Sequence, residues 1–345
     1  MVNGLQVGGR RRAGPVFAVV WLVSTLVLAA YAALNPVSFD EGGAVALPAG
    51  LVCTAALLWW LGGAPVPEEA ALEGTRTRRL VLAALGAAAV LLLIVTVFSR
   101  GLMFGIPVLA AAVLVWLRPP LTWRAALYAL GLSVVAGVAG LGIGHITFIS
   151  PIEWAALQVP LVWLSLLAGW ALLQRSGLSA AGLGASLYLS RGVGAALRGF
   201  GIGMLLAIPW ALVNVVMGGA GEDAWATEWW RPLAALQPGI AEEAWGRVFL
   251  VGLLYVVLRR AGRSGPALTA AVLVAAYWFA YLHTVDTPYL ASRVISTVLI
   301  GTLFSLPLSY IWLRRGLETA IGFHFCMDAV RFGAAVLMNL GVMRL

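Results

Sequence analysis

Long apolar runs follow one another along the chain, and short polar segments separate them. Each run is continuously apolar over about 20 residues, the length of a helix that crosses a bilayer. Strands of a membrane barrel would alternate instead, so a barrel is excluded. The pattern predicts an all-α, polytopic transmembrane bundle of about eleven helices. We expect these helices near residues 14–34, 43–63, 80–98, 101–117, 125–144, 154–174, 199–219, 236–258, 267–285, 290–313 and 316–340.

The composition agrees with this pattern. Hydrophobic residues make up 62% of the 345 residues and charged residues only 10%, with a mean hydropathy of +0.96. A soluble domain is about half apolar and a quarter charged, so we expect an integral, multi-pass membrane protein. Charges inside the predicted spans concentrate after residue 199. We therefore expect residues 1–198 to form an N-terminal helical region and residues 199–345 to form a second region that carries the function.

The distribution of arginine predicts the membrane topology. The net charge is +8, the sequence contains no lysine, and most arginines lie in alternate connections, as at 10–12, 76–79, 259–263 and 314–315. This asymmetry is typical of cytoplasmic loops and predicts a cytoplasmic N-terminus. It explains the basicity without a nucleic-acid partner. A lysine-free composition rich in alanine, glycine and arginine is typical of GC-rich bacterial genomes, so we expect the bacterial plasma membrane.

The cysteines and the glycine clusters provide no cofactor site. Cys53 and Cys326 both lie in predicted spans, without a CxxC pair or a disulfide framework. The clusters GLGIG and GFGIG do not follow a strand, so they do not form a dinucleotide fingerprint. Gly140 and Gly144 are four residues apart and are better explained as small residues at a helix contact. We expect no nucleotide or other organic cofactor.

Three charges interrupt the apolar segment IAEEAWGRVFL, namely Glu242, Glu243 and Arg247. Charges inside a membrane span are costly and are functional candidates by default. Glu243 and Arg247 are four residues apart, so they can pair along one face of a helix. Glu242 is displaced from that pair and has no partner in its own helix. We interpret the pair as structural and Glu242 as the group that is free for chemistry.

Two of the three histidines also lie in predicted spans. The stretch YWFAYLHTV places Phe279 and His283 four residues apart, and GFHFCMDAV places His324 and Asp328 at the same spacing. One carboxylate and two imidazoles from three helices can activate water directly or bind a metal ion. Asp328 has a second interpretation, an ion pair with Arg331 three residues later.

These motifs resemble those of the CPBP family of intramembrane proteases, which includes type II CAAX prenyl endopeptidases and bacteriocin-processing or self-immunity proteins. The family motifs EExxxR, FxxxH and HxxxN/D occur here in the same order as EEAWGR (242–247), FAYLH (279–283) and HFCMD (324–328). One motif alone is weak evidence, whereas three in order on apolar helices are specific. The resemblance covers about the last third of the chain. It makes 199–345 the expected protease core and says nothing about 1–198.

The resemblance implies roles for three of these residues. Glu242 matches the catalytic glutamate of the family, which activates the hydrolytic water together with His283. His324 matches the residue that stabilises the oxyanion or binds a metal ion. These assignments agree with the unpaired state of Glu242 that helix spacing predicts.

The other motif positions support the site. Glu243 and Arg247 match bracing positions, and Phe279 is expected to pack beside the site. Asp328 stands where asparagine is common, and an ionised aspartate cannot donate a hydrogen bond to an oxyanion. It is therefore expected to be neutral, to orient His324 or to bind a metal ion. This difference favours a Zn²⁺ site, with the candidate ligands Glu242, His283, His324 and Asp328.

The implied function is an intramembrane endopeptidase that hydrolyses a peptide bond of a membrane-associated peptide or protein, in or at the bilayer. Two alternatives stay open. One is a non-catalytic bacteriocin-immunity or scaffold protein of the same family, and the other is a proton- or cation-coupled transporter. A transporter predicts ionisable groups at every depth of the membrane, whereas here the unpaired ones gather in three helices. The intact set of motifs favours an active hydrolase.

The predicted depths of the site residues in the membrane do not agree. Counted from the arginine-rich ends at about 1.5 Å per residue, Glu242 and His283 lie toward the outer half of the membrane. His324 lies nearer the inner third of its own helix. Offset or re-entrant helices, or a later start of the last span, would bring the three side chains together.

Other conspicuous residues have ordinary explanations. His145 lies in a loop without a companion motif and is expected to be a surface residue. The tryptophans at 225, 229 and 230 are more typical of an interfacial belt than of a substrate clamp.

Overall fold

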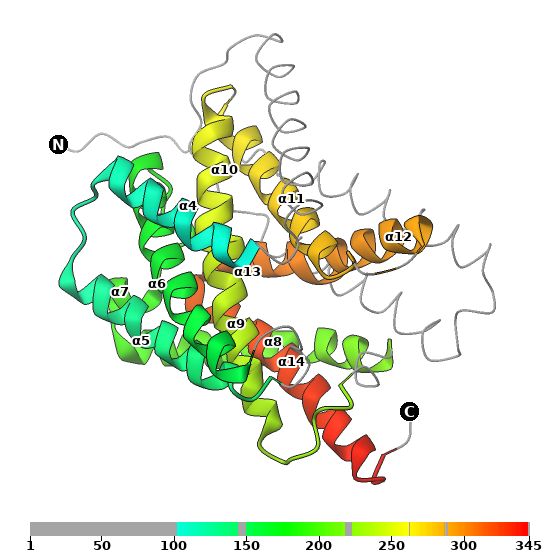
Figure 1. Cartoon of the computed structure of the whole chain (residues 1–345). Coiled ribbons are helices and arrows are strands. Elements are labelled where there is room, and N and C mark those ends of the chain that lie inside the picture. Colours follow the sequence, from blue (N-terminus) through cyan, green and yellow to red (C-terminus); the bar gives the residue numbers. More distant parts are fainter. Residues whose placement is uncertain are drawn as a thin grey trace, which may run out of the picture.

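A computed structural model describes residues 102–143, 150–217, 223–261, 263–285, 287 and 289–343. This part of the chain is helical and contains no strand. Its elements are α4 (Leu102–Leu117), α5 (Trp123–Gly140), α6 (Pro151–Ser176), α7 (Leu187–Arg191), α8 (Val193–Val216), η3 (Arg231–Ala235), α9 (Leu236–Glu242), η4 (Glu243–Phe249), α10 (Leu250–Arg259), α11 (Ser264–Leu282), α12 (Leu290–Ile300), η5 (Gly301–Ser305), α13 (Leu306–Arg315) and α14 (Leu317–Asn339) (Figure 1).

The predicted spans from 101–117 onward each fall on a helix or on a continuous helical segment. Six helices of the described part are long and apolar enough to cross a membrane, when Leu290–Arg315 is counted as one. These helices confirm an integral, multi-pass membrane protein. The total of about eleven is not confirmed, because the first three predicted spans lie outside the described residues. Cys53 and His145 also lie outside them.

Local sequence signals set the bounds of α6. Ser150 accepts a hydrogen bond from the backbone of Glu153, and the Glu153 carboxylate accepts one from the backbone of Ser150, which forms a capping box. Pro151 occupies the first helical position, where its missing N–H has no cost. The helix ends at Gly177, whose φ of 79° suits glycine.

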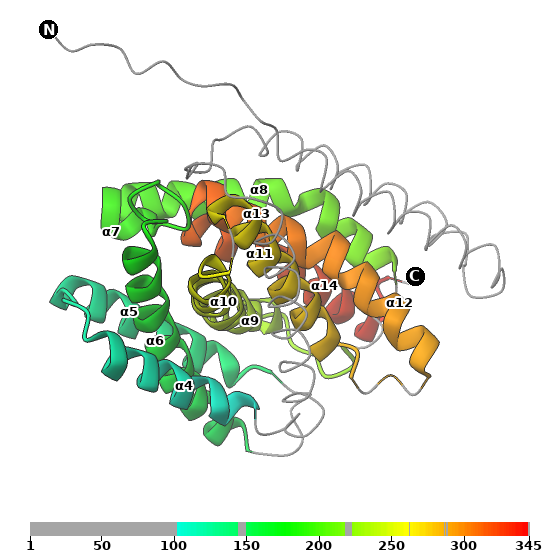
Figure 2. The ribbon, with the colours of Figure 1, turned by 90° about the horizontal axis from the view of Figure 1, so that it is seen from above.

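The segment from α9 through η4 to α10 runs through the centre of the bundle. Figure 2 looks almost along α10, and the other described helices surround it. On one side α6 packs against η4 and α10, and Gly169 and Gly252 allow a close approach of these helices. On the other side α14 lies across α9 and packs along α8. The central segment is therefore held in contact with α14.

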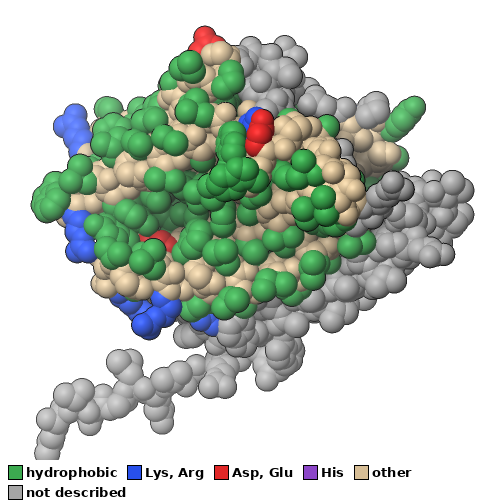
Figure 3. Space-filling model, turned by 90° about the horizontal axis from the view of Figure 1, so that it is seen from below, with side chains coloured by type: hydrophobic (Ala, Val, Ile, Leu, Met, Phe, Trp, Pro, Cys, Tyr) green, Lys and Arg blue, Asp and Glu red, His purple; other side chains and the backbone are tan. Residues whose placement is uncertain are grey.

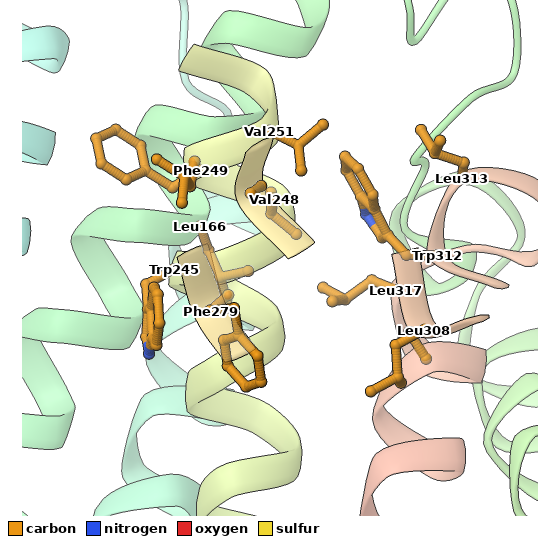
Figure 4. Close-up of a cluster of buried hydrophobic side chains, with 14 of the residues drawn as sticks. Leu166, Trp245, Val248, Phe249, Val251, Phe279, Leu308, Trp312, Leu313 and Leu317 are labelled. Atoms are coloured by element: carbon orange, nitrogen blue, oxygen red, sulfur yellow. The ribbon is translucent and has the colours of Figure 1, made fainter. Parts of the chain in front are cut away.

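Aromatic and branched aliphatic side chains form the core around this segment. Figure 4 shows Trp245 and Phe279 on one side of the cluster and Trp312, with Leu317, on the other. Phe249 and Trp312 are almost completely buried. The same core contains residues of α4, α5 and α6, so both predicted regions contribute to it within the described residues.

The contact between α8 and α14 depends on glycine. A Cβ atom at Gly203 would lie 2.1 Å from the carbonyl oxygen of Thr319, and one at Gly322 would lie 2.1 Å from that of Phe200. Two helix backbones therefore touch directly, as small residues allow in membrane helices. Gly203 ends the GFGIG cluster, and this contact is its structural role. Gly140 also lies at a helix contact, beside Trp154.

The helix α14 begins inside the protein. Gly316 adopts a φ of 95°, and a Cβ atom there would lie 2.7 Å from the carbonyl oxygen of Ala185. Leu317 is fully buried, and its N–H donates to the same oxygen. The segment between α6 and α7 thus covers the start of α14.

Candidate active site

The two glutamates lie where an α-helix changes into a wider π-helix. Glu242 is the last residue of α9, and η4 begins with Glu243 and includes Arg247. Every residue of η4 is buried. Single π turns inside α-helices occur frequently at functional sites. Adjacent residues on a helix point about 100° apart, so the two carboxylates face different directions.

One histidine ring lies between these carboxylates. Nδ1 of His324 lies 2.8 Å from Oε1 of Glu243, which is a direct hydrogen bond. Nε2 of the same ring lies 3.5 Å from Oε2 of Glu242. The ring is almost completely buried. Neighbouring glutamates on one helix thus face the two nitrogens of a single imidazole on α14.

The predicted pair of Glu243 and Arg247 is present. Their side chains are buried, and Nη1 of Arg247 lies 3.3 Å from Oε1 of Glu243. Nη2 of Arg247 donates to Oγ of Ser305 at 3.1 Å, and the guanidinium lies 4.1 Å from the centre of the Phe279 ring. Phe279 packs against the pair as well as against His283, with ring centres 4.5 Å apart.

His283 caps the C-terminus of α11 and faces Glu242. Its Nδ1 lies 2.9 Å from the backbone oxygen of Phe279, and because a carbonyl only accepts, Nδ1 is the donor. Nε2 then faces Oε2 of Glu242 at 3.8 Å. The side chain of His283 is 41% exposed and that of Glu242 is 20% exposed. The site is therefore open on the His283 side.

The loop after His283 is held by polar contacts. Thr284 and Thr297 share a hydrogen bond of 2.7 Å between their hydroxyl oxygens. The guanidinium of Arg293 donates twice to the backbone oxygen of Thr287, at 2.7 and 3.2 Å. These contacts fix the position of His283 at the end of its helix.

Asp328 faces the histidine rather than the arginine. Its Oδ2 lies 3.5 Å from Nε2 of His324, the nitrogen that also faces Glu242. Nε of Arg331 instead lies 2.9 Å from Oδ2 of Asp223, in the segment before η3. The ion pair of Arg331 is therefore made with Asp223, a residue outside all three motifs.

Two carboxylate oxygens of the site, Oε2 of Glu242 and Oε2 of Glu243, lack a hydrogen-bond partner within the described part of the chain, and the first of them faces two imidazole nitrogens. Oε2 of Glu242 is buried and has no hydrogen-bond partner among the described residues. It lies 3.5 and 3.8 Å from the two imidazole nitrogens, which is longer than a direct hydrogen bond. Such spacing suits a water molecule held between a general base and two imidazoles.

The described residues contain no group of three or more His, Cys, Asp or Glu side chains arranged to hold a metal ion. The four side chains expected to bind Zn²⁺ are thus close together, but they do not have the arrangement of a metal centre. Zinc therefore stays a prediction.

The structure brings together all the residues singled out from the three motifs, and it adds residues that the motifs did not indicate. Ser305 lies in η5, more than fifty residues from Arg247, and nothing in its local sequence distinguishes it. Although their positions along the helices predict different depths, His283 and His324 lie 3.8 and 3.5 Å from the same oxygen of Glu242.

The tryptophans before η3 lie outside this cluster. Trp225 donates to Asp223 and packs edge-on against Phe332, whereas Trp229 is 82% exposed. Trp230 stacks under the guanidinium of Arg231. Their interfacial position stays a prediction.

Comparison with known protein families supports this reading of the motifs. Residues 224–330 match the family model described as type II CAAX prenyl endopeptidase Rce1-like, a segment of about a third of the chain that contains all three motifs. The match confirms the resemblance to the CPBP family of intramembrane proteases. No curated protein and no solved structure shows significant similarity to the chain.

Proposed function

Because residues 224–330 match a CAAX-protease family model, we propose that the protein is an intramembrane endopeptidase in which Glu242 activates water. One observation carries this proposal. Oε2 of Glu242 is a buried acceptor without a hydrogen bond, and it faces Nε2 of both His283 and His324. A carboxylate in this position can accept a proton from a water molecule that the imidazoles orient.

The hydrolysis assigns one role to each group. Glu242 removes a proton from water, and the water oxygen attacks the carbonyl carbon of the scissile peptide bond. Nδ1 of His283 donates to a backbone carbonyl, so its Nε2 is a hydrogen-bond acceptor. Nε2 accepts a hydrogen bond from the second O–H group of the water and thereby orients the water oxygen toward the substrate. Glu242 then passes its proton to the leaving amine nitrogen as the C–N bond breaks.

His324 stabilises the negative charge that develops on the carbonyl oxygen. Its Nε2 is the donor on the open side of the ring, since Nδ1 donates to Glu243. Glu243 in turn is held by Arg247, so the orientation of the ring is fixed before substrate binds. Donors fixed in advance cost no reorganisation when charge develops.

Asp328 anchors His324 in this proposal. Its carboxylate lies close to Nε2 of the ring, and a carboxylate beside a histidine holds the ring and favours its proton-donating form. Among the described residues, the carboxylates that lie away from the ends of the predicted spans, Glu242, Glu243 and Asp328, gather around His324 in one cluster. A single cluster supports hydrolysis over an ion path, which would need groups at several depths.

The expected substrate is a peptide segment of a membrane-associated protein. Glu242 is only partly exposed and lies among apolar helices, so the scissile bond must enter a site largely shielded from bulk water. Exclusion of water strengthens each electrostatic contact with the reacting group.

Exchanging each glutamate for glutamine tests the proposal. Glu242→Gln should abolish cleavage and leave thermal stability in detergent nearly unchanged, because it removes only the base. Glu243→Gln should lower the free energy of unfolding by about 3–5 kcal/mol, because it leaves Arg247 buried without its charge partner. The measurement is cleavage of quenched fluorescent single-span peptides in liposomes, together with thermal unfolding.

The matched control is Glu228→Gln, on a surface glutamate whose exposed pair with Arg231 contributes little. It should change neither rate nor stability. Full activity of the Glu242→Gln protein would refute the proposal. Repeating the wild-type assay after chelation and dialysis tests zinc: an unchanged rate supports direct activation of water by Glu242, whereas loss of the rate and its return with Zn²⁺ would establish the metal site.

A further inference from the structure

Arginines mark one end of the bundle. Ten of the fourteen arginines in the described residues lie at the ends of α4, α6, α7, α10 and α13 or at the starts of the helices that follow. They are Arg118, Arg124, Arg175, Arg191, Arg198, Arg259, Arg260, Arg263, Arg314 and Arg315. On the face shown in Figure 3, most arginine side chains gather along the left and lower-left edge, and most of the remaining described surface is hydrophobic.

Hydrogen bonds show that these helix ends lie together. They link α10 with α6, the segment after α6 with α13, and α5 with α7. The bonds are Arg259 Nη1 to the Ser176 oxygen at 2.6 Å, Gly184 N to the Leu313 oxygen at 3.1 Å, and Arg124 Nη2 to the Tyr188 oxygen at 3.3 Å. We call this end of the bundle the arginine end.

Hydrogen bonds also link the helix ends on the opposite side of the bundle, where carboxylates accompany the few arginines. Arg231 donates to the backbone oxygen of Gly142 at 2.7 Å, and Asn339 donates to that of Ala226 at 2.8 Å. Of the described arginines near this end, Arg231 and Arg331 form ion pairs with Glu228 and Asp223, and Arg293 bonds a backbone carbonyl. The exposed Glu153 also lies here. We call it the acidic end.

Ten arginines at one end and three at the other form the asymmetry of the positive-inside rule. Because short connections with excess arginine stay in the cytoplasm, the arginine end is the cytoplasmic one. The acidic end then faces the other side of the membrane.

Glu242 and His283 lie far from the arginine end. Between Arg263 and His283 lie the 19 residues of α11, which span about 28 Å, nearly the thickness of the hydrocarbon core. Glu242 precedes Arg259 by 17 residues, or about 25 Å. His283 is also the most exposed of the candidate catalytic side chains. The opening of the site is therefore near the acidic end.

We propose that the site takes its substrate from the non-cytoplasmic half of the membrane: a membrane-anchored polypeptide whose scissile bond lies in that half. The proposal rests on the endopeptidase function and adds the side of cleavage and the class of substrate. Exported proteins and peptides with a hydrophobic anchor present such bonds. Lipidated tails that stay in the cytoplasm do not.

Cysteine labelling tests the orientation without any need for activity. In a background with Cys53→Ala and Cys326→Ala, one variant carries Tyr289→Cys, six residues after His283 at a position that is 74% exposed. The matched variant carries Ala180→Cys, exposed in the connection after α6 at the arginine end. A membrane-impermeant maleimide is added to intact bacterial cells and to lysed cells.

We expect Tyr289→Cys to be labelled equally before and after lysis, and Ala180→Cys to be labelled only after lysis. The reverse pattern would overturn the proposal. Equal labelling of both variants in intact cells would also overturn it, because the chain would then have no single orientation.

Cleavage of two reporter sets tests the substrate class. Each reporter is a single-span protein, and the same apolar test sequence is placed in the non-cytoplasmic half in one set and in the cytoplasmic half in the other. We expect loss of the intact reporter only in the first set and no loss with Glu242→Gln. Cleavage of only the second set would overturn the proposal. Cleavage of neither set, with the expected labelling, would instead count against the endopeptidase function itself.

Discussion

Two neighbouring glutamates have different environments because they point in different directions from one helix. Glu243 is fully buried and contacts both Arg247 and His324, so its charge is compensated from two sides. Glu242 keeps an oxygen without a hydrogen bond and lies next to the open side of the site. A buried carboxylate in an ion pair with arginine suits support, whereas one that faces two imidazoles on the open side of the site suits proton transfer.

Asp328 provides a test at the same scale. Asp328→Asn should lower the rate of cleavage about 10–100-fold, the range for lost partners of a functional histidine. The reason is that the change removes the negative charge that faces Nε2 of His324. The measurement is the rate of peptide cleavage as a function of pH by purified, metal-free protein.

Two outcomes would contradict the anchoring role of Asp328. A full rate that extends to higher pH would mean that Asp328 acts as a neutral donor, since an amide donates at any pH. The matched control is Asp223→Asn, on the carboxylate that pairs with Arg331. It should lower thermal stability and leave the rate near that of the wild type.

At the scale of elements, contact between helix backbones positions the site. The catalytic carboxylates lie on the central segment, and His324 lies on α14, so the distance between the two elements sets the geometry of the site. Gly203 and Gly322 bring α8 against α14, and Gly239 of α9 lies against the backbone of α14 at Phe325. Backbones in contact leave little freedom for α14 to shift.

Gly203→Ala should disturb this packing. The new Cβ atom would lie 2.1 Å from a backbone oxygen of α14, which cannot move aside as a flexible side chain can. We expect a loss of about 1–3 kcal/mol in the free energy of unfolding and a lower rate of cleavage, because α14 carries His324. Thermal unfolding in detergent and the peptide assay measure the two effects.

Gly201→Ala is the matched control on the same helix. A Cβ atom there meets nothing within 4 Å, so the change should leave the rate unchanged and stabilise the helix by about 0.5–1 kcal/mol. Equal effects of the two alanines would show that helix propensity, and not the contact with α14, is responsible.

At the scale of the whole molecule, one buried carboxylate joins distant parts of the chain. Glu318 of α14 accepts hydrogen bonds from Tyr128 of α5 and from Ser186, and also from the backbone N–H groups of Leu187 and Tyr188. The four bonds measure 2.7–2.9 Å and reach across 130 to 190 residues of sequence. They hold the start of the catalytic helix against the N-terminal part of the described bundle.

Removing this carboxylate should loosen the whole assembly. Glu318→Ala leaves four donors without an acceptor. Each buried donor without a partner lowers the free energy of unfolding by about 1–3 kcal/mol. We expect a large fall in thermal stability and faster proteolysis in the segment before α7. Tyr128→Phe is the control, because it removes one of the four bonds and should cost about 1 kcal/mol. A Glu318→Ala protein as stable as the Tyr128→Phe protein would contradict this role.

Local spacing was sufficient for much of the site. Helix periodicity by itself placed Glu243 beside Arg247 and set Glu242 apart, because contacts at four residues depend only on the geometry of one helix. The same local rule puts Nδ1 of His283 next to the backbone oxygen of Phe279. The helical class, and the spans from 101–117 onward, followed from the lengths of the apolar runs.

The contacts between helices were decided only by the tertiary structure. Asp328 and Arg331 are close enough in sequence to pair, but Arg331 pairs with Asp223 and Asp328 faces His324, because α14 turns one face to the segment before η3 and another to the catalytic carboxylates. Ser305 meets Arg247 only because two π-helical segments pack together. His324 meets Glu242 and Glu243 only because α14 packs across α9. Apolar runs determine which segments cross the membrane, because crossing depends on the transfer of side chains from water to lipid. The relative positions of these helices depend instead on close packing between side chains from distant parts of the chain.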